Sequence, residues 1–409
     1  MIYKLIYKVA LLAILPIVFI YLIFYSIYLK DIYFLLNKIG YIRNLKNKKY
    51  SLCLHCASLG EINGIKSLIK KIKNNNTVII STNTISGKKR AQELFPELDV
   101  IYFPLDYKIF IAPWLNSIKF KNIVIYETEI WPNFYESCDK KDIKIGIINA
   151  RFSKKILNGN KIIKNLYRQS LNKCSFILCK SNYEKNKYLD LKVNKKLLFH
   201  LGNLKYSCFQ EIEEKNKNSN KKNFFLMAST HQPDEEVFKS SITYLLEKKV
   251  PVVIAPRHIT RANEIIKYFT NLDIKVKNYS EFSLHSNEKY LADGVIVLDT
   301  FGDLIDFYNE AKFVYVGGGF SDRGVQNILE PAAFGRAIFV GPNLENVKDE
   351  IKDLKVRIIK DRNPLPVVID YIENINPDII GSKTKIEFMK FSGILDEYID
   401  FLKNEEIIN

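Results

Sequence analysis

Cysteine is scarce in this 409-residue chain, and its six copies are scattered. Cys53 and Cys56 are three apart on an expected strand, so their side chains should point to opposite faces. This pattern predicts neither a zinc site nor a disulfide framework, and it favours reduced thiols in a cytoplasmic compartment. Zinc-finger, helix-turn-helix and RNP-like signatures are also absent, so the net charge of +16 does not predict binding to nucleic acid. We expect that charge to favour anionic lipid instead.

Charged residues are missing from positions 9–29. This run is long enough to cross a hydrocarbon core of about 30 Å as a helix. It is longer than the apolar region of about 7–15 residues in a secretory signal, and no small-x-small cleavage site follows it. More basic residues follow the run than precede it, which predicts a single anchor in the inner membrane with the body on the cytoplasmic side.

After the anchor, short β-rich runs alternate with helical periods, which is typical of parallel α/β sheets. We therefore predict an α/β fold with two Rossmann-like domains facing a cleft, preceded by a membrane-anchor helix. The expected parts are an anchor and juxtamembrane segment (1–49), a first domain (50–210), a polar linker (211–223), a second domain (224–380) and a C-terminal helix (381–409). The expected strands are 50–58, 77–81, 100–103, 122–126, 143–149 and 176–180 in the first domain, and 224–228, 250–255, 274–277, 294–298, 313–316 and 337–340 in the second.

Two carboxylates, Glu127 and Glu129, directly follow the expected strand that ends at Tyr126. Ligands of open α/β sheets bind at the carboxyl ends of the strands, and a buried acid pair there needs hydrogen bonds or balancing charge. This position indicates a functional site. An acidic loop that caps the next helix would show the same residues.

Glu61 lies where the first strand gives way to a helix, because apolar residues at helical spacing begin at Ile62. It could serve as a general base, or it could be an ordinary first-turn acid that complements the helix dipole. The loop 81–89, with its hydroxyl residues and Gly87, could bind an anion or a sugar through backbone N–H groups, or could form only an N-cap.

The second domain also has polar residues at its expected strand ends. Arg257 and His258 end one strand, and His231 follows another without an evident capping role. In the segment 316–335, glycines would let the backbone approach a ligand. Asn327 and Glu330 have the spacing of a capping box, and Glu330 could also accept hydrogen bonds from a ribose.

Taken in order, these motifs resemble those of the Kdo transferases. That family comprises membrane-anchored glycosyltransferases that move 3-deoxy-D-manno-oct-2-ulosonic acid (Kdo) from CMP-Kdo to a lipid A precursor. The resemblance spans nearly the whole body, and its motifs are residues 58–61, 81–87, 102–106, 127–133, 149–153, 202–205, 228–231, 256–258, 299–302 and 327–331.

The resemblance implies a GT-B glycosyltransferase of lipopolysaccharide core biosynthesis, with the acceptor lipid (lipid IVA) bound by the first domain and CMP-Kdo by the second. It makes Glu61 the general base and Glu129 and Lys205 the groups that stabilise the transition state. Transfer would invert the anomeric carbon and need no cofactor and no metal. The implied CMP contacts are Arg257, His258, Phe301, Gly302, Asp303, Asn327, Ile328, Leu329 and Glu330.

The sequence departs from the family pattern at Val325 and Gln326, where a glycine and a histidine are expected, and at residues 343–347. These departures leave the role of that histidine and of that loop without support. Two alternatives remain: another membrane-anchored glycosyltransferase using a different nucleotide sugar, and a catalytically inert nucleotide-binding membrane protein.

Overall fold

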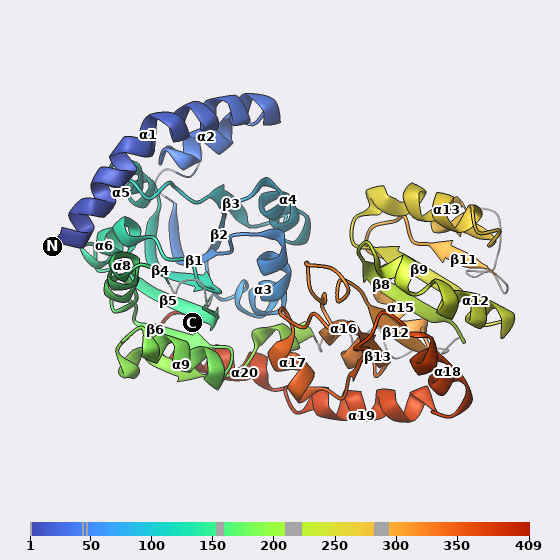
Figure 1. Cartoon of the computed structure of the whole chain (residues 1–409). Coiled ribbons are helices and arrows are strands. Elements are labelled where there is room, and N and C mark those ends of the chain that lie inside the picture. The colour runs from blue at the N-terminus through green and yellow to red at the C-terminus, as the bar shows by residue number, and fades with distance from the viewer. Residues whose placement is uncertain (1, 43–44, 46–47, 153–158, 209–222, 282–293) are drawn as a thin grey trace. The chain divides into compact units, whose positions relative to one another are not determined.

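The computed structural model describes residues 2–42, 45, 48–152, 159–208, 223–281 and 294–409. The chain divides into two compact units, each built around its own sheet (Figure 1). Unit 1 comprises Met1–Ser207 and Gly393–Asn409, and unit 2 comprises Cys208–Ser392. The predicted linker 211–223 lies, except for its last residue, outside the described residues.

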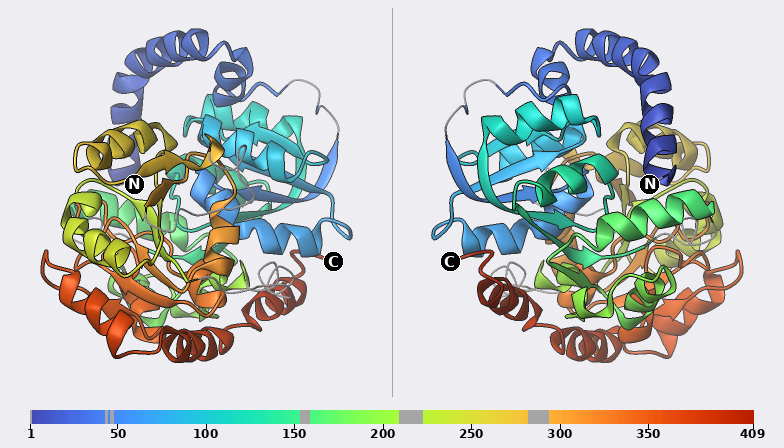
Figure 2. Two further views of the ribbon diagram at one scale, coloured as in Figure 1. Left: turned by 90° about the vertical axis from the view of Figure 1, so that its right-hand side faces the viewer. Right: turned by 90° about the vertical axis from the view of Figure 1, so that its left-hand side faces the viewer.

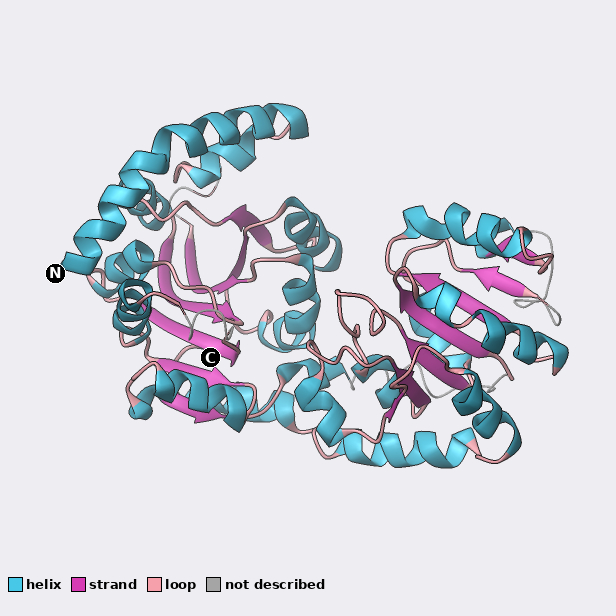
Figure 3. Cartoon of the chain, in the orientation of Figure 1, coloured by secondary structure: helices cyan, strands magenta, loops and turns pink. Residues whose placement is uncertain are grey.

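Unit 1 contains a seven-stranded sheet with the order β3-β2-β1-β4-β5-β6-β7, and all its strand pairs are parallel. Its central strands are continuous apolar runs buried on both faces, as expected where helices cover both sides of a parallel sheet (Figure 3). The strands are β1 (Lys49–His55), β2 (Val78–Thr82), β3 (Asp99–Tyr102), β4 (Lys119–Tyr126), β5 (Lys144–Ala150), β6 (Phe176–Cys179) and β7 (Leu198–His200).

The helices of unit 1 bury one apolar face each. In α3, Ile62, Ile65 and Ile69 recur at helical spacing and are all buried. The body helices and 3₁₀ turns are α3 (Leu59–Ile72), α4 (Ile85–Leu94), α5 (Lys108–Ser117), α6 (Pro132–Asp139), α8 (Lys161–Leu171), α9 (Asn182–Asp190), η1 (Lys195–Leu197), η2 (Leu204–Cys208) and α20 (Ile394–Asn404).

Unit 2 repeats the architecture with a second parallel sheet of order β10-β11-β9-β8-β12-β13-β14. Its strands are β8 (Phe225–Thr230), β9 (Val252–Pro256), β10 (Val276–Asn278), β11 (Val295–Val297), β12 (Phe313–Val316), β13 (Ala337–Val340) and β14 (Arg357–Ile358). Its helices are α11 (Asp234–Val237), α12 (Lys239–Glu247), η4 (Ile259–Arg261), α13 (Ala262–Thr270), α15 (Leu304–Glu310), α16 (Leu329–Ala333), α17 (Lys348–Asp353), α18 (Leu365–Glu373) and α19 (Pro377–Met389).

The N-terminal segment forms α1 (Ile2–Leu29), a long helix, followed by the short α2 (Ile32–Lys38). Residues Tyr3–Leu29 are long and apolar enough to cross a membrane. The helix is curved and contains Pro16, a residue that bends helices (Figure 2). It is also attached to unit 1, since the Tyr7 hydroxyl donates to Asp106 (2.7 Å) and the Tyr107 hydroxyl donates to the Leu11 carbonyl (2.7 Å).

The two predicted Rossmann-like domains are confirmed, and each predicted strand corresponds to a strand of the structure. Two short edge strands, β7 and β14, were not predicted, because three and two residues leave too little periodicity to detect. The single helix expected over 381–409 is wrong. That stretch holds the end of α19 and all of α20, which starts after Gly393, and α20 returns to unit 1.

Candidate active site

The first candidate site lies at the switch point of the unit 1 sheet. The chain runs from β1 to β2 and β3 on one side and then returns to place β4 on the other side of β1. In open α/β sheets, the loops that leave the carboxyl ends of such a strand pair form the ligand crevice. Here these two loops carry Glu61 and Glu127.

Glu61 lies in the first turn of α3 and bends back over the loop that follows β1. Its carboxylate accepts hydrogen bonds from the Ala57 backbone N–H (2.7 Å) and the Ser58 hydroxyl (3.2 Å). Burial and, to a smaller extent, the nearby Glu127 carboxylate together raise the pKa of Glu61 to about 7. Glu61 is thus a first-turn acid, as one of the two interpretations expected, and the same contacts fix a carboxyl whose pKa would suit proton transfer near neutral pH.

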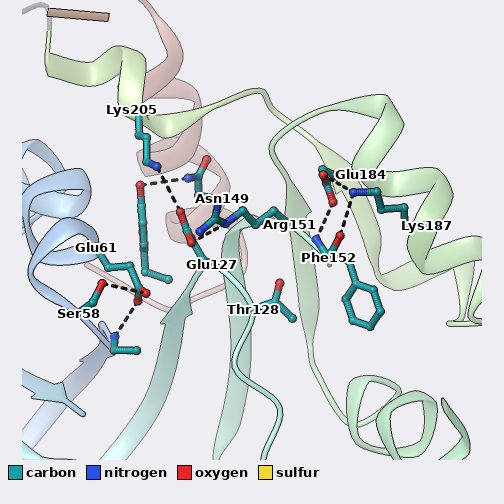
Figure 4. A network of polar contacts seen from close by, with 12 residues as sticks. Ser58, Glu61, Glu127, Thr128, Asn149, Arg151, Phe152, Glu184, Lys187 and Lys205 are labelled. Atoms are coloured by element: carbon teal, nitrogen blue, oxygen red, sulfur yellow. Dashed lines mark hydrogen bonds and ion pairs between the residues drawn. The ribbon is translucent and has the colours of Figure 1, made fainter. Parts of the chain in front are cut away.

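Glu127 is buried between two cations (Figure 4). One carboxylate oxygen lies 2.7 Å from the Arg151 Nε, and the other lies 3.3 Å from the Lys205 Nζ. The Glu127 backbone has a φ of 60°, a left-handed conformation that is uncommon outside glycine and is often found at functional sites. The two cations supply the charge balance that a buried carboxylate requires.

Arg151 is placed by the end of β5, the strand next to β4. In the next residue, Phe152, both the backbone N–H and the backbone carbonyl form hydrogen bonds. Its N–H donates to Glu184 (2.6 Å), and its carbonyl accepts from Lys187 (2.8 Å), which also pairs with Glu184 (2.7 Å). This buried network, visible in Figure 4, fixes the direction in which the chain leaves Arg151.

Lys205 is placed from a different direction, by η2. The Asn149 side-chain oxygen at the end of β5 accepts from the Leu204 backbone N–H (3.0 Å). The Tyr398 hydroxyl, on α20, donates to the Gly202 carbonyl (2.8 Å), and Gly202 has a φ of 98° that favours glycine. The returning C-terminal helix thus supports the turn that carries Lys205.

Glu129 lies two residues beyond Glu127 and faces a different partner. Its carboxylate accepts from the Asn83 side-chain amide (3.2 Å), and the Asn83 carbonyl oxygen accepts from the buried Lys38 ammonium (3.1 Å). Burial raises the pKa of Glu129, while Lys38 opposes that rise. The ion pair that the structure shows for Lys205 is with Glu127, so Lys205 and Glu129, both predicted to stabilise the transition state, have separate partners.

The loop from Glu127 to Trp131 is held at its far end by Asp106. Its carboxylate accepts from the backbone N–H groups of Asn133 (3.0 Å) and Phe134 (2.8 Å), and so caps the start of α6. Burial raises the pKa of Asp106 to about 6. The Asp106 carboxylate thus joins the segments 102–106 and 127–133 in the fold.

The second candidate site lies at the switch point of the unit 2 sheet, between β8 and β12. Asp234 joins the loops that leave these strands. Its carboxylate accepts from the backbone N–H groups of His231 (2.9 Å) and Gly318 (2.7 Å) and from the Tyr315 hydroxyl (2.7 Å). Its side chain is buried, which raises its pKa to about 6.

The glycines after β12 serve this loop packing. A Cβ at Gly317 would lie 2.6 Å from the Thr230 Cα, and one at Gly319 would lie 2.6 Å from the backbone of Gly341. The close approach predicted for these glycines is therefore made to neighbouring backbone of the protein itself. Gln326, where a histidine was expected, donates its side-chain amide to the Gly324 carbonyl (3.1 Å) and so closes the same loop.

Cationic side chains gather at this edge of unit 2. Arg257 and His258 follow β9 and are exposed, and the His258 ring lies 5.9 Å from that of His231. Burial lowers the pKa of His231, and the positive charges of His258, Arg261, Arg257 and Arg323 lower it further. An anion bound here would relieve that repulsion.

The remaining predicted nucleotide contacts differ in exposure and in the groups that could meet a ligand. Phe301 is 82% exposed, Gly302 has a φ of 101°, and Asp303 directly precedes α15. The Asn327 side chain accepts from the Leu329 backbone N–H (3.1 Å), and the helix begins at Leu329, two residues after the first member of the predicted capping box. The side chains of Ile328 and Leu329 are buried, which leaves only their backbone groups to meet a ligand. Glu330 lies in the first turn of α16.

Sequence reasoning placed Glu61 and the acidic loop correctly at strand ends and treated Glu127 only as one of a carboxylate pair, but it gave no role to Arg151, Asn83 or Lys38. Arg151 and Asn83 lie inside motifs that the sequence showed. Nothing in the sequence pointed to Lys38 as a residue of the sheet edge, because it belongs to a segment that we expected to be juxtamembrane.

Comparison with known proteins shows what the chain is similar to. Residues 35–208 match the family model described as 3-deoxy-D-manno-octulosonic-acid transferase (kdotransferase). A bifunctional glycosyltransferase/methyltransferase of Fusobacterium nucleatum is 30% identical over 77% of this chain, which spans only 51% of that relative. A 3-deoxy-D-manno-octulosonic acid transferase of Rickettsia conorii is 27% identical over 85% of this chain and 78% of its own length.

Among solved structures, the UDP-GlcNAc 2-epimerase of Neisseria meningitidis, bound to UDP-GlcNAc, has a TM-score of 0.62 with 12% identity and covers 87% of this chain and 100% of its own. That likeness concerns the fold alone. The family model and the sequence relatives agree, and the chain is similar to the Kdo transferases over most of its length.

Proposed function

We propose that this protein transfers Kdo from CMP-Kdo to a lipid A precursor, lipid IVA, with inversion at the anomeric carbon. The observation that carries the proposal is the convergence of Glu61, Glu127, Arg151 and Lys205 at the switch point of unit 1. The relatives named as 3-deoxy-D-manno-octulosonic acid transferases support Kdo as the transferred group, and the donor and acceptor are part of the proposal.

The chemistry requires a base, because a sugar hydroxyl is a weak nucleophile. In the proposal, Glu61 takes the proton of the acceptor hydroxyl as that oxygen bonds to the Kdo anomeric carbon and the bond to the CMP phosphate breaks. The raised pKa of Glu61, about 7, supports this role, since a base works best when its pKa is near the operating pH. One base and a direct displacement account for inversion.

Charge must also be balanced, because the donor has both a carboxylate and a phosphate. Lys205 and Arg151 are half exposed although both contact the buried Glu127, so they can face substrate and carboxylate together. We propose that Lys205, with Arg151 beside it, offsets negative charge that develops during transfer, and that Glu129 stabilises positive charge at the sugar carbon.

The nucleotide is proposed to bind unit 2, at the edge formed by Arg257, His258 and the loop after β12. The cationic cluster around His231 supports a phosphate there, and Gly302, Asn327 and Glu330 would contact the remainder of CMP. No cofactor or metal is part of this proposal, because the named side chains supply the proton acceptor and the counter-charges.

The acceptor is a lipid, and we propose that α1 holds the enzyme at the inner membrane with its body on the cytoplasmic side. Exposed apolar side chains occur along most of α1, and further ones lie on α2 and α5. Anionic lipid would also attract a protein of net charge +16.

The test is mass spectrometry of lipid IVA incubated with the purified protein and freshly generated CMP-Kdo. We expect a mass increment of one or more Kdo units with the intact protein and none with Glu61→Gln. Glu93→Gln, which changes an exposed glutamate of the same unit, is the matched control. No increment with folded intact protein and dispersed lipid would overturn the proposal.

A further inference from the structure

Lys38 reaches the edge of the unit 1 sheet from outside the Rossmann-like body. It is the last residue of α2, and its ammonium is buried. The Lys38 carbonyl accepts from the Leu105 backbone N–H (3.0 Å), and the neighbouring Asn37 side chain accepts from the Tyr102 backbone N–H (3.0 Å). The end of α2 is therefore fixed to the residues that leave β3.

A buried lysine must have partners that accept hydrogen bonds, because an unpaired ammonium in the interior is costly. The partner shown is the Asn83 side-chain oxygen, at 3.1 Å. The opposite end of the same amide donates to Glu129 (3.2 Å). The Asn83 backbone N–H also donates to the Ala57 carbonyl (3.2 Å). The Ala57 backbone N–H in turn donates to the Glu61 carboxylate.

The order of these groups fixes the orientation of the amide. An ammonium only donates hydrogen bonds, so it must face the Asn83 oxygen. The Asn83 nitrogen then faces Glu129 and donates to it, which requires an acceptor there. Lys38 thereby fixes the orientation of the Asn83 amide. The amide in turn orients the Glu129 carboxylate and favours its ionised form.

We propose that Lys38 is a positioning residue that acts through Asn83 to hold the Glu129 carboxylate ionised and oriented at the active site. This inference rests on the proposed function, in which Glu129 takes part in transfer. It also assigns a catalytic use to the segment between the apolar helix and β1, for which sequence reasoning had none.

The charges around Glu129 show in which direction its pKa would change if the Lys38 charge were removed. Lys38 lowers the Glu129 pKa, and the Glu127 carboxylate raises it. The Trp131 side chain also lowers it, so removal of the lysine charge would weaken but not abolish the opposition to burial, and Glu129 would take up a proton at a higher pH. The groups facing it from other elements are Lys38 on α2, Glu61 on α3, Tyr135 on α6 and Tyr167 on α8.

The kinetic test uses the full-length protein with CMP-Kdo and lipid IVA. We expect Lys38→Met to lower kcat at least tenfold, with little change in KM, and to move the acidic limb of the kcat profile to higher pH. Asn83→Leu, which keeps the cation and removes the amide, should lower kcat as well. Lys38→Arg, which keeps the charge, should recover part of the rate lost in Lys38→Met.

The matched control is Lys48→Met. Lys48 belongs to the same N-terminal segment, but its ammonium is on the surface, paired with Asp99 at 2.9 Å. This variant should keep the rate and the pH profile of the intact protein. A folded Lys38→Met variant with an unchanged profile would overturn the inference, and so would an equal loss in Lys48→Met.

Thermal unfolding supplies a readout that does not depend on transfer. Lys38→Met should lower Tm because it leaves Glu129 charged and without its cation, and adding Glu129→Gln should restore much of that loss. Additive changes in Tm would contradict the coupling of Lys38 to Glu129. An intact protein that transfers no Kdo would instead contradict the proposed function, while the unfolding cycle still tests the coupling.

Discussion

The Lys205 ammonium lies 3.3 Å from one oxygen of Glu127, and the Arg151 guanidinium lies 2.7 Å from the other. Three loops of unit 1, from β4, β5 and η2, thus meet at one buried carboxylate. Removing either cation would leave a buried negative charge partly uncompensated, which is more costly than losing a surface pair. The site is therefore organised before any substrate arrives.

Lys205→Met should leave the protein folded and lower kcat about 10²-fold, a magnitude typical of removing one group that stabilises transition-state charge. The measurement is the steady-state rate of Kdo transfer. Lys173→Met is the control, because Lys173 pairs with Asp139 away from these loops. A near-normal rate in Lys205→Met would restrict the lysine to a packing role.

Glu61→Gln should lower kcat by about 10²- to 10⁴-fold, because the amide cannot accept the hydroxyl proton. The amide is close in shape to the carboxyl, so the variant should fold and bind CMP with an affinity like that of the intact protein. Single-turnover transfer and CMP titration measure the two properties separately. Full transfer by Glu61→Gln would require a different base.

The raised pKa of Glu61 predicts how kcat/KM depends on pH on the acidic side. It also predicts the direction in which the stability of the fold changes with pH. Transfer requires the ionised base, so kcat/KM should rise with pH up to about 7 and then level off. The folded protein holds this proton more tightly than the unfolded chain, so ionisation destabilises the fold progressively from the ordinary glutamate pKa up to about 7. Glu61→Gln should therefore raise Tm at pH 8 and change it little at pH 4, as measured by calorimetry at both values.

The two Rossmann-like domains could be predicted because each central strand is a continuous apolar run and each run is followed by a helical period. Short edge strands could not, since β14 has only two residues and its place depends on pairing with β13. The break between α19 and α20 was missed because it is only a short turn before Gly393, and the assignment of α20 to unit 1 depends on its packing there.

The position of a candidate residue was predictable where the residue lies within a few positions of the end of a strand, as Glu61 and Glu129 do. Contacts between distant segments were not predictable. Nothing in the spacing of Lys205 shows that it pairs with Glu127, because that contact depends on how η2 packs beneath Tyr398 and beside Asn149. Lys38 was hidden for the same reason, as its partner Asn83 lies on another element.

Arg257→Met should raise the KM for CMP-Kdo at least tenfold with a smaller effect on kcat, because a cation at this strand end would bind the phosphate in ground state and transition state alike. Isothermal titration with CMP should show the same loss. Arg362→Met removes another exposed arginine of unit 2 and should leave both values unchanged. If the two variants bind CMP equally well, the phosphate does not contact Arg257.

The outward apolar face of α1 should determine membrane association. Leu12 and Ile17 are 69% and 70% exposed, and lysines there would place two charges among the side chains that meet the hydrocarbon. The double variant Leu12→Lys with Ile17→Lys should sediment less with vesicles of anionic and zwitterionic lipid, and its transfer to lipid IVA in those vesicles should fall in parallel. The control is Ile379→Lys with Ile386→Lys, which places two lysines at exposed apolar positions of unit 2. If both double variants sediment like the intact protein, basic surface charge rather than α1 holds the protein on the lipid, and raising the salt concentration should then release it.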